Sequence, residues 1–344
     1  MAKTIDKTKL DDLFDRLLNF EIYAPAQEDG VNLYRLLDNQ LPDRFGNSKK
    51  PPKEIFFPQT EKMFDFEVED SKVVDIKEPG ISDNPILLFG IRPCDARAMM
   101  VLDELFTWDF VDPFYVERRE KATTISLACT LPDMPRQSCF CTSVGGSPGS
   151  PEGADMLWTD IGHQYLVDSS TEKGNKIIDL GGNLFADAAD AEIEQACQAR
   201  EEASQAIVRT LDIDGLAEAL DNGFDQKFWE GFSSRCLGCG ICTLLCPTCH
   251  CFDINDVSKR EGTWRERTWD SCQYAHYTAH ASGHNPRPEK KHRQRNRICH
   301  KFLYAEKNLC RIGCVGCGRC ISQCPVNIDI IEVAEGVKGA VNDA

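Results

Sequence analysis

The sequence predicts two domains of different kinds: a mixed domain of α+β or α/β type over residues 1–225, and a cysteine-rich domain over residues 226–344. A length of 344 residues is enough for two domains, each with its own core. The charge changes near the same boundary. Residues 1–230 carry 23 Lys and Arg against 44 Asp and Glu, whereas residues 231–344 carry 16 against 11. The third observation is that eight of the 18 cysteines fall in two short runs of the rear part.

The composition excludes several classes of protein. A net charge of −16 argues against a nucleic-acid binder, whose surface would be basic. The best apolar run, residues 85–91, is far shorter than the roughly 18 residues of a membrane span. The first residues also lack the apolar stretch of a secretory signal. We therefore expect a soluble, cytoplasmic protein, in which cysteines serve metal or redox chemistry rather than disulfides.

In the front domain, apolar residues at helical spacing predict a helix over residues 6–19. Residues 86–91 are typical of a buried strand, and they run through a short turn into a helix over 96–106, with Asp95 as the expected N-cap. Further strands are expected at 123–129, 156–159 and 164–167, and a further helix at 191–209. No glycine-rich phosphate-binding motif of the dinucleotide or P-loop type accompanies these elements.

The two cysteine runs carry the strongest signal. Both match C-x2-C-x2-C-x3-C-P, the spacing of bacterial-type ferredoxins: one starts at Cys236 and the other at Cys314. Three cysteines, each separated from the next by two residues, can bind one [4Fe–4S] cubane if the loop bends tightly. The glycines between them give the backbone the freedom to make that bend. The fourth cysteine leaves the loop on a helical turn and ligates the other cluster.

The predicted ligand sets follow from this exchange. Cluster I takes Cys236, Cys239, Cys242 and Cys324; cluster II takes Cys314, Cys317, Cys320 and Cys246. A zinc site is the alternative, but zinc favours two separated C-x2-C pairs rather than a triple followed by C-P. The rear domain is therefore expected to be ferredoxin-like, with two [4Fe–4S] clusters.

The two runs are separated by 67 residues, which is a large insertion for a ferredoxin. We expect a helical insertion at about 252–309, with helices over 263–281 and 298–309. Its basic stretch, residues 287–301, has two interpretations: a surface that docks a partner or tunes a cluster potential, or a solvated helix face. The second is favoured, because charge runs are commonly solvated.

Ten cysteines remain outside the two runs, and two groups of them are candidates for a further iron–sulfur or metal site. The first group is Cys94, Cys129, Cys139 and Cys141; the weaker group is Cys249, Cys251 and Cys272, with His250 as an additional donor. Cys94 at a helix N-terminus is expected to have a stabilised thiolate. Cys197 and Cys299 are expected to be buried structural thiols, since free cysteine behaves as a small apolar residue.

Several short motifs narrow the set of ferredoxin-like proteins that the chain can resemble. They are GIRPCDA at 90–96, CFCTS at 139–143, CPTCHCFD at 246–253, WDSC at 269–272 and GHN at 283–285. With the second cysteine run, the chain resembles the family that comprises sulfhydrogenase beta subunits and the A-type subunits of anaerobic sulfite reductase. Similar electron-transfer subunits accompany heterodisulfide reductase-like complexes. The resemblance covers about residues 50–330.

The resemblance implies an iron–sulfur relay inside a cytoplasmic complex of an anaerobe. Such a subunit passes electrons between a flavin-bearing nucleotide oxidoreductase and a hydrogenase, sulfite reductase or heterodisulfide reductase-type partner, and has no bond-making chemistry of its own. The alternative is a redox enzyme subunit whose front domain binds a substrate, a flavin or a third cluster. A cluster-based sensor is disfavoured, because no DNA-binding basic helix is present.

Overall fold

A computed structural model describes residues 2–37, 46–70, 72–132, 134 and 136–342 of the chain. The front part is built on an eight-stranded sheet in the order β10-β1-β9-β8-β7-β6-β2-β3. Its strands are β1 (Lys3–Asp6), β2 (Glu21–Glu28), β3 (Val31–Leu36), β6 (Ile86–Ile91), β7 (Ala122–Leu127), β8 (Met156–Asp160), β9 (Gln164–Ser169) and β10 (Phe185–Asp187). The centre of this sheet, β2, β6, β7 and β8, is parallel, and the flanking strands are antiparallel.

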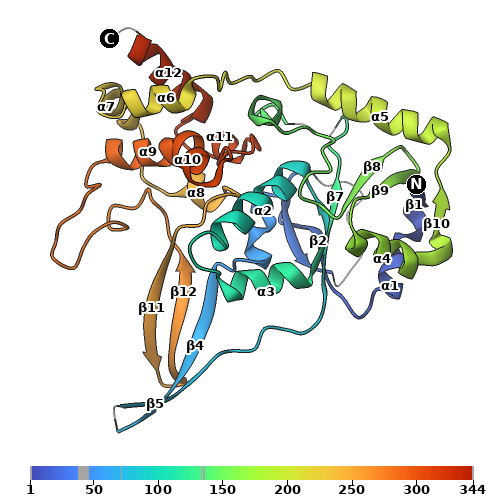
Figure 1. Cartoon of the computed structure of the whole chain (residues 1–344), viewed down its shortest axis with the longest axis horizontal. Helices are drawn as coiled ribbons and strands as arrows, with labels where there is room; N and C mark the ends of the chain where they lie inside the picture. The colour runs from blue at the N-terminus through green and yellow to red at the C-terminus, as the bar shows by residue number, and fades with distance from the viewer. Residues whose placement is uncertain (1, 38–45, 71, 133, 135, 343–344) are drawn as a thin grey trace.

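Helices cover both faces of this sheet, which is why every residue of β6 and β7 is buried. Helices α1 (Leu10–Arg16) and α4 (Glu172–Gly181) pack on one face, and α2 (Pro93–Phe106) with α3 (Pro113–Lys121) on the other (Figure 1). Helix α5 (Asp190–Gln205) lies against β8 and β9. The predicted α/β character and the strands of the front part are confirmed, and the first helix is shorter than the sequence predicts.

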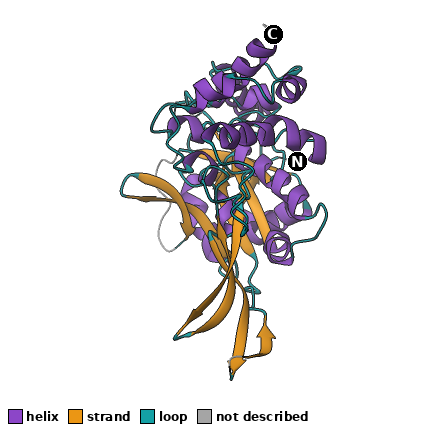
Figure 2. Ribbon diagram, turned by 90° about the vertical axis from the view of Figure 1, so that its left-hand side faces the viewer, coloured by secondary structure: helices purple, strands orange, loops and turns teal. Residues whose placement is uncertain are grey.

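The rear part is mainly helical (Figure 2). Helices α6 (Leu216–Asn222), α7 (Phe228–Ser233), α9 (Lys290–Cys299), α10 (Ala305–Leu309) and α12 (Ile330–Asn342) surround one apolar core; a turn of π-helix, His300–Tyr304, joins α9 to α10. Trp229 is fully buried in this core. Two four-residue helices, α8 (Ile241–Leu244) and α11 (Arg319–Ser322), each follow one cysteine loop.

The insertion between the cysteine runs is helical only in its second half. Its first half forms a hairpin of β11 (Phe252–Lys259) and β12 (Gly262–Trp269), so the helix expected over residues 263–281 is wrong. The hairpin joins β4 (Thr60–Glu69) and β5 (Lys72–Lys77) in a second sheet, ordered β11-β12-β4-β5. This sheet extends away from the rest of the molecule (Figures 1 and 2).

A buried ion-pair network explains why this segment forms a strand rather than the expected helix. Arg267 of β12 is 1% exposed and pairs with Glu61 of β4 and Asp112 at the start of α3. The threonine–tryptophan pairs near both ends of β12 also suit a pleated, half-buried strand, because both residue types favour strands. The hairpin is therefore fixed by contacts with the front part, which the local sequence does not contain.

The packing also favours a domain boundary earlier than residue 225. The chain leaves the front sheet where α5 ends at Gln205, and Leu211 and Leu216 already belong to the rear core. Phe140 and Val144 of the front part lie in that same rear core. The two parts are thus joined over a shared apolar interior as well as through the second sheet.

Candidate metal centres

The two cysteine loops have the same backbone design. In each, two glycines adopt positive φ: Gly238 and Gly240 in the first loop, at 72° and 76°, and their counterparts Gly316 and Gly318 in the second, at 64° and 72°. The later glycine of each pair caps the short helix that follows, and α8 and α11 lie in contact. Left-handed backbone at these positions lets each loop bend around a common centre.

The loops enclose two separate cavities. The first cavity is lined by Cys236, Cys239, Cys242 and Cys324, and Cys320 also reaches it. The second cavity is lined by Cys246, Cys314, Cys317 and Cys320. Apart from the presence of Cys320 in the first cavity as well, each cavity combines three cysteines of one run with the last cysteine of the other, which is the grouping that the predicted exchange requires.

The second loop is pressed against the front part. A Cβ on Gly316 would lie 2.5 Å from the backbone nitrogen of Cys141, and a Cβ on Gly318 would lie 2.4 Å from Ser138 Oγ. The Phe140 amide also donates to the Gly316 carbonyl, at 2.9 Å. Glycine is therefore needed here for close approach as well as for its backbone conformation, and the CFCTS segment serves as the support of this loop.

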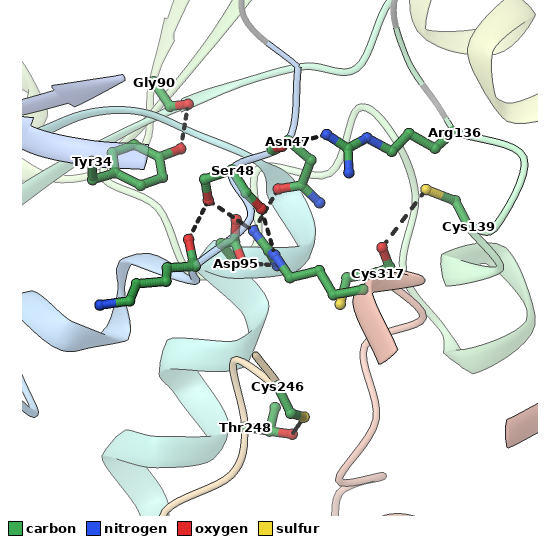
Figure 3. A network of polar contacts seen from close by, with 12 residues as sticks. Tyr34, Asn47, Ser48, Gly90, Asp95, Arg136, Cys139, Cys246, Thr248 and Cys317 are labelled. Atoms are coloured by element: carbon green, nitrogen blue, oxygen red, sulfur yellow. Dashed lines mark hydrogen bonds and ion pairs between the residues drawn. The ribbon is translucent and has the colours of Figure 1, made fainter. Parts of the chain in front are cut away.

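A buried ion pair fastens the same loop to helix α2 (Figure 3). Arg319 is 1% exposed, and its guanidinium binds both carboxylate oxygens of Asp95, at 2.6 and 2.8 Å. Its Nε donates to the Ser48 carbonyl at 2.9 Å. Asp95 is therefore not the N-cap that we expected: α2 begins one turn earlier, after Arg92, with Pro93 in its first position.

The chemistry of the two cavities fits iron–sulfur clusters. Burial raises the pKa of the Cys314 thiol to about 12 and that of the Cys317 thiol to about 11, and a metal is what deprotonates such thiols outright. Over the described residues, no three Cys, His, Asp or Glu side chains converge closely enough for a single metal ion. When bound, the clusters would supply one-electron transfer.

The basic stretch of the insertion is the clearest correction at this site. Arg293, Arg297 and Lys301 are spaced four residues apart along α9 and its continuation, and all three are buried. Arg297 lines both cysteine cavities, and Lys301 lines the second. The favoured expectation of a solvated helix face is wrong for this side of the helix, because it faces the cysteine loops.

The weaker group of extra cysteines lies around a third cavity, lined by Cys249, Cys251, Cys272, His250, His300, Arg297 and Lys301. Burial lowers the pKa of His250 to about 3 and that of His300 to about 4, so both imidazoles are neutral donors. The sequence identified His250 as a donor but gave no reason to choose His300, which lies 50 residues further along the chain.

The first group of extra cysteines, in the front part, is arranged differently. Cys94, Cys129, Cys139 and Cys141 line neither the two cluster cavities nor the third one. Cys129 and Cys139 pack with Met134 in a small apolar cluster, and Cys139 lies 3.9 Å from the Cys317 carbonyl. Burial and the neighbouring Asp95 raise the pKa of Cys94 well above its ordinary value. The expectation that the Cys94 thiolate is stabilised is therefore wrong.

The isolated cysteines divide in the same way. Cys299 is buried as expected, whereas Cys197 is exposed on α5 and the expectation of a buried thiol is wrong for it. None of the 18 cysteines forms a disulfide. Among the described residues, no helix is long and apolar enough to cross a membrane.

Comparison with known proteins defines the class of this chain. Residues 235–328 match the family model of a 4Fe-4S dicluster domain. With the two adjoining cysteine cavities, this match identifies the chain as an iron–sulfur electron-transfer subunit that carries two [4Fe–4S] clusters.

Within that class, the chain is 29% identical over 332 residues to sulfhydrogenase 2 subunit beta of Pyrococcus furiosus, a match that covers 95% of both chains. Together with the dicluster domain, this similarity bears out the predicted resemblance to sulfhydrogenase beta subunits.

The Asp95–Arg319 pair predicts a large loss of stability when it is broken. Asp95→Ala leaves the buried guanidinium without a carboxylate, which should lower the free energy of unfolding by about 3–5 kcal/mol. Glu117→Ala, which removes an exposed partner of Lys121, is the control and should cost less than about 1 kcal/mol. Urea titrations of the anaerobically purified proteins compare them, and equal losses in the two variants would contradict this role for Asp95.

Proposed function

We propose that this chain is a relay that carries electrons between a catalytic partner and a flavin-bearing nucleotide oxidoreductase, and that it forms no substrate bonds itself. The observation that carries the proposal is the contact between the two cysteine cavities, since Cys320 and Arg297 line both. Two centres that share lining residues suit a path for electrons through the protein. The free cysteines and the family relationship support a cytoplasmic complex of an anaerobe.

The partner is expected to be of hydrogenase, sulfite reductase or heterodisulfide reductase type. Anaerobic size exclusion of a native extract should place the chain in a complex well above 38.6 kDa, together with a flavoprotein and one catalytic subunit. Mass spectrometry of that fraction identifies them, and the isolated recombinant chain provides the size reference. A monomer that carries both clusters and has no companion in the extract would contradict the relay proposal.

We assign the ligands as the sequence predicts: Cys236, Cys239, Cys242 and Cys324 to cluster I, and Cys314, Cys317, Cys320 and Cys246 to cluster II. The grouping of cysteines around the first and second cavities supports this assignment.

The exchange of the fourth cysteines between the two runs makes a specific prediction. Cys246→Ser should alter the same electron paramagnetic resonance signal as Cys317→Ser, because both residues line the second cavity. Cys324→Ser should instead alter the signal that Cys239→Ser alters. If Cys246→Ser reproduces the spectrum of Cys239→Ser, each run binds its own cluster and the exchange is wrong.

A third centre is proposed at the third cavity rather than at the front cysteines. Three thiols and two neutral imidazoles line the third cavity, whereas the front group packs in part as ordinary apolar side chains. Arg297 and Lys301 bring positive charge to the same place. A cubane ligated by Cys249, Cys251, Cys272 and one histidine would use this donor set.

Iron analysis tests the third centre. Protein purified without oxygen should contain about twelve irons per chain, four for each cubane. Cys272→Ala should lose about four, and Cys94→Ala should lose none. About eight irons in the unaltered protein would leave the third cavity without a cluster, and iron loss in Cys94→Ala alone would move the centre to the front group.

One observation favours the alternative of a ligand-binding front domain. A cavity of about 420 Å³ lies where β7 and β8 end, the usual ligand position in parallel α/β sheets. Lys7, Arg92, Asp160, Tyr165 and Glu202 are among its lining residues. Flavin released on denaturation of the purified chain would support this alternative, whereas iron and sulfide alone would support the relay.

A further inference from the structure

Arg297 lies where all three cysteine cavities meet. It lines the first, second and third cavities, and its side chain comes from helix α9 of the insertion. Lys301, one turn further on, lines the second and third cavities but not the first. The two cations thus differ in which cavities they reach.

The burial of Arg297 is unusual because no carboxylate accompanies it. Among the residues that the structure describes, three arginines are less than 4% exposed: Arg267, Arg297 and Arg319. Arg267 pairs with Glu61 and Asp112, and Arg319 pairs with Asp95. Over the described residues Arg297 forms no ion pair with an acidic side chain, and its Nε has no hydrogen-bond partner. A buried charge without a counter-charge is very costly, so a negative group is expected beside it.

The groups that surround Arg297 are cysteines. Burial alone would lower the pKa of Arg297, but negative charge at nearby cysteines, Cys242, Cys320, Cys249 and Cys246 above all, raises it well above its ordinary value. For Lys301 burial is likewise opposed by Cys246, Cys249 and Cys314, which raise its pKa. Neither set of acting charges is a carboxylate, and the two sets follow the cavities that each cation lines.

We propose that Arg297 is the shared counter-charge of clusters I and II and sets the reduction potential of both. Lys301, by contrast, acts on cluster II and not on cluster I. The inference rests on the proposed ligand assignment. Reduction adds a negative charge to an already anionic cluster, and a nearby buried cation stabilises the reduced form. Removing the cation therefore lowers the reduction potential of every cluster that it faces.

The test is a pair of variants with a matched control. Arg297→Gln should lower both midpoint potentials, whereas Lys301→Gln should lower the potential of cluster II and leave that of cluster I unchanged. Arg295→Gln is the control, since Arg295 lies on the same helix but donates to Phe224 and Asp225. Redox titrations followed by electron paramagnetic resonance measure each cluster, with the Cys239→Ser and Cys317→Ser spectra identifying the signals.

Arg297→Lys keeps the charge and should retain both clusters with potentials closer to those of the unaltered protein. If Arg297→Gln fails to assemble clusters, the midpoint potentials of both clusters in Arg297→Lys are compared with those in Lys301→Gln, and this comparison decides the inference. Potentials that are unchanged in Arg297→Gln, or a cluster I potential that falls with Lys301→Gln, would overturn it. Failure of the relay proposal is distinguishable, because it would appear as a monomer that carries both clusters and has no companion in the extract, whatever the potentials of the variants.

Discussion

Concentrated negative charge is the constraint on which the rear part of this molecule depends. Eight cysteines lie around two adjoining cavities, and four thiolates on each cubane leave it anionic. Such charge is stable in a buried place only if cations or donors face it. The insertion meets this need, because α9 and the π-helical turn that follows it place the buried Arg297 and Lys301 beside the cysteine loops. Gln294 adds a donor, with its Nε2 2.9 Å from Cys236 Sγ.

The front part holds one of the two loops in place. Arg319 sits between two cysteines of the second loop, and its buried partner Asp95 belongs to the first turn of α2. In the same loop, Gly316 and Gly318 pack against residues 138–141 without room for a Cβ. The GIRPCDA and CFCTS motifs therefore have a structural role beside the second loop, which explains why these segments accompany a dicluster domain. The first loop has its contacts mainly within the rear part, including Gln273 and Gln294 beside its cavity.

The elements that the sequence predicts well are those whose signal is local. Buried strands such as β6, the spacing of the cysteine runs and the glycines between them are all contained in a few consecutive residues. The hairpin β11–β12 was missed because its decisive contact, Arg267 with Glu61, joins residues 206 positions apart. The buried side of α9 was missed for a different reason: the side chains that line the cavities together with Arg297 are largely cysteines, which sequence patterns count as apolar. The spacing of Arg293, Arg297 and Lys301 at every fourth residue was the available signal.

The choice of arginine at the junction of the cavities has two consequences. A guanidinium stays protonated at every physiological pH, whereas a buried lysine readily loses its proton, so Arg297 supplies a charge that does not vary with pH. Without clusters, however, that charge is buried at a high cost, because the described residues provide no carboxylate for it. Clusters bound in the cavities would supply negative charge beside Arg297, so their binding free energy is expected to stabilise the packing of the rear core around α9.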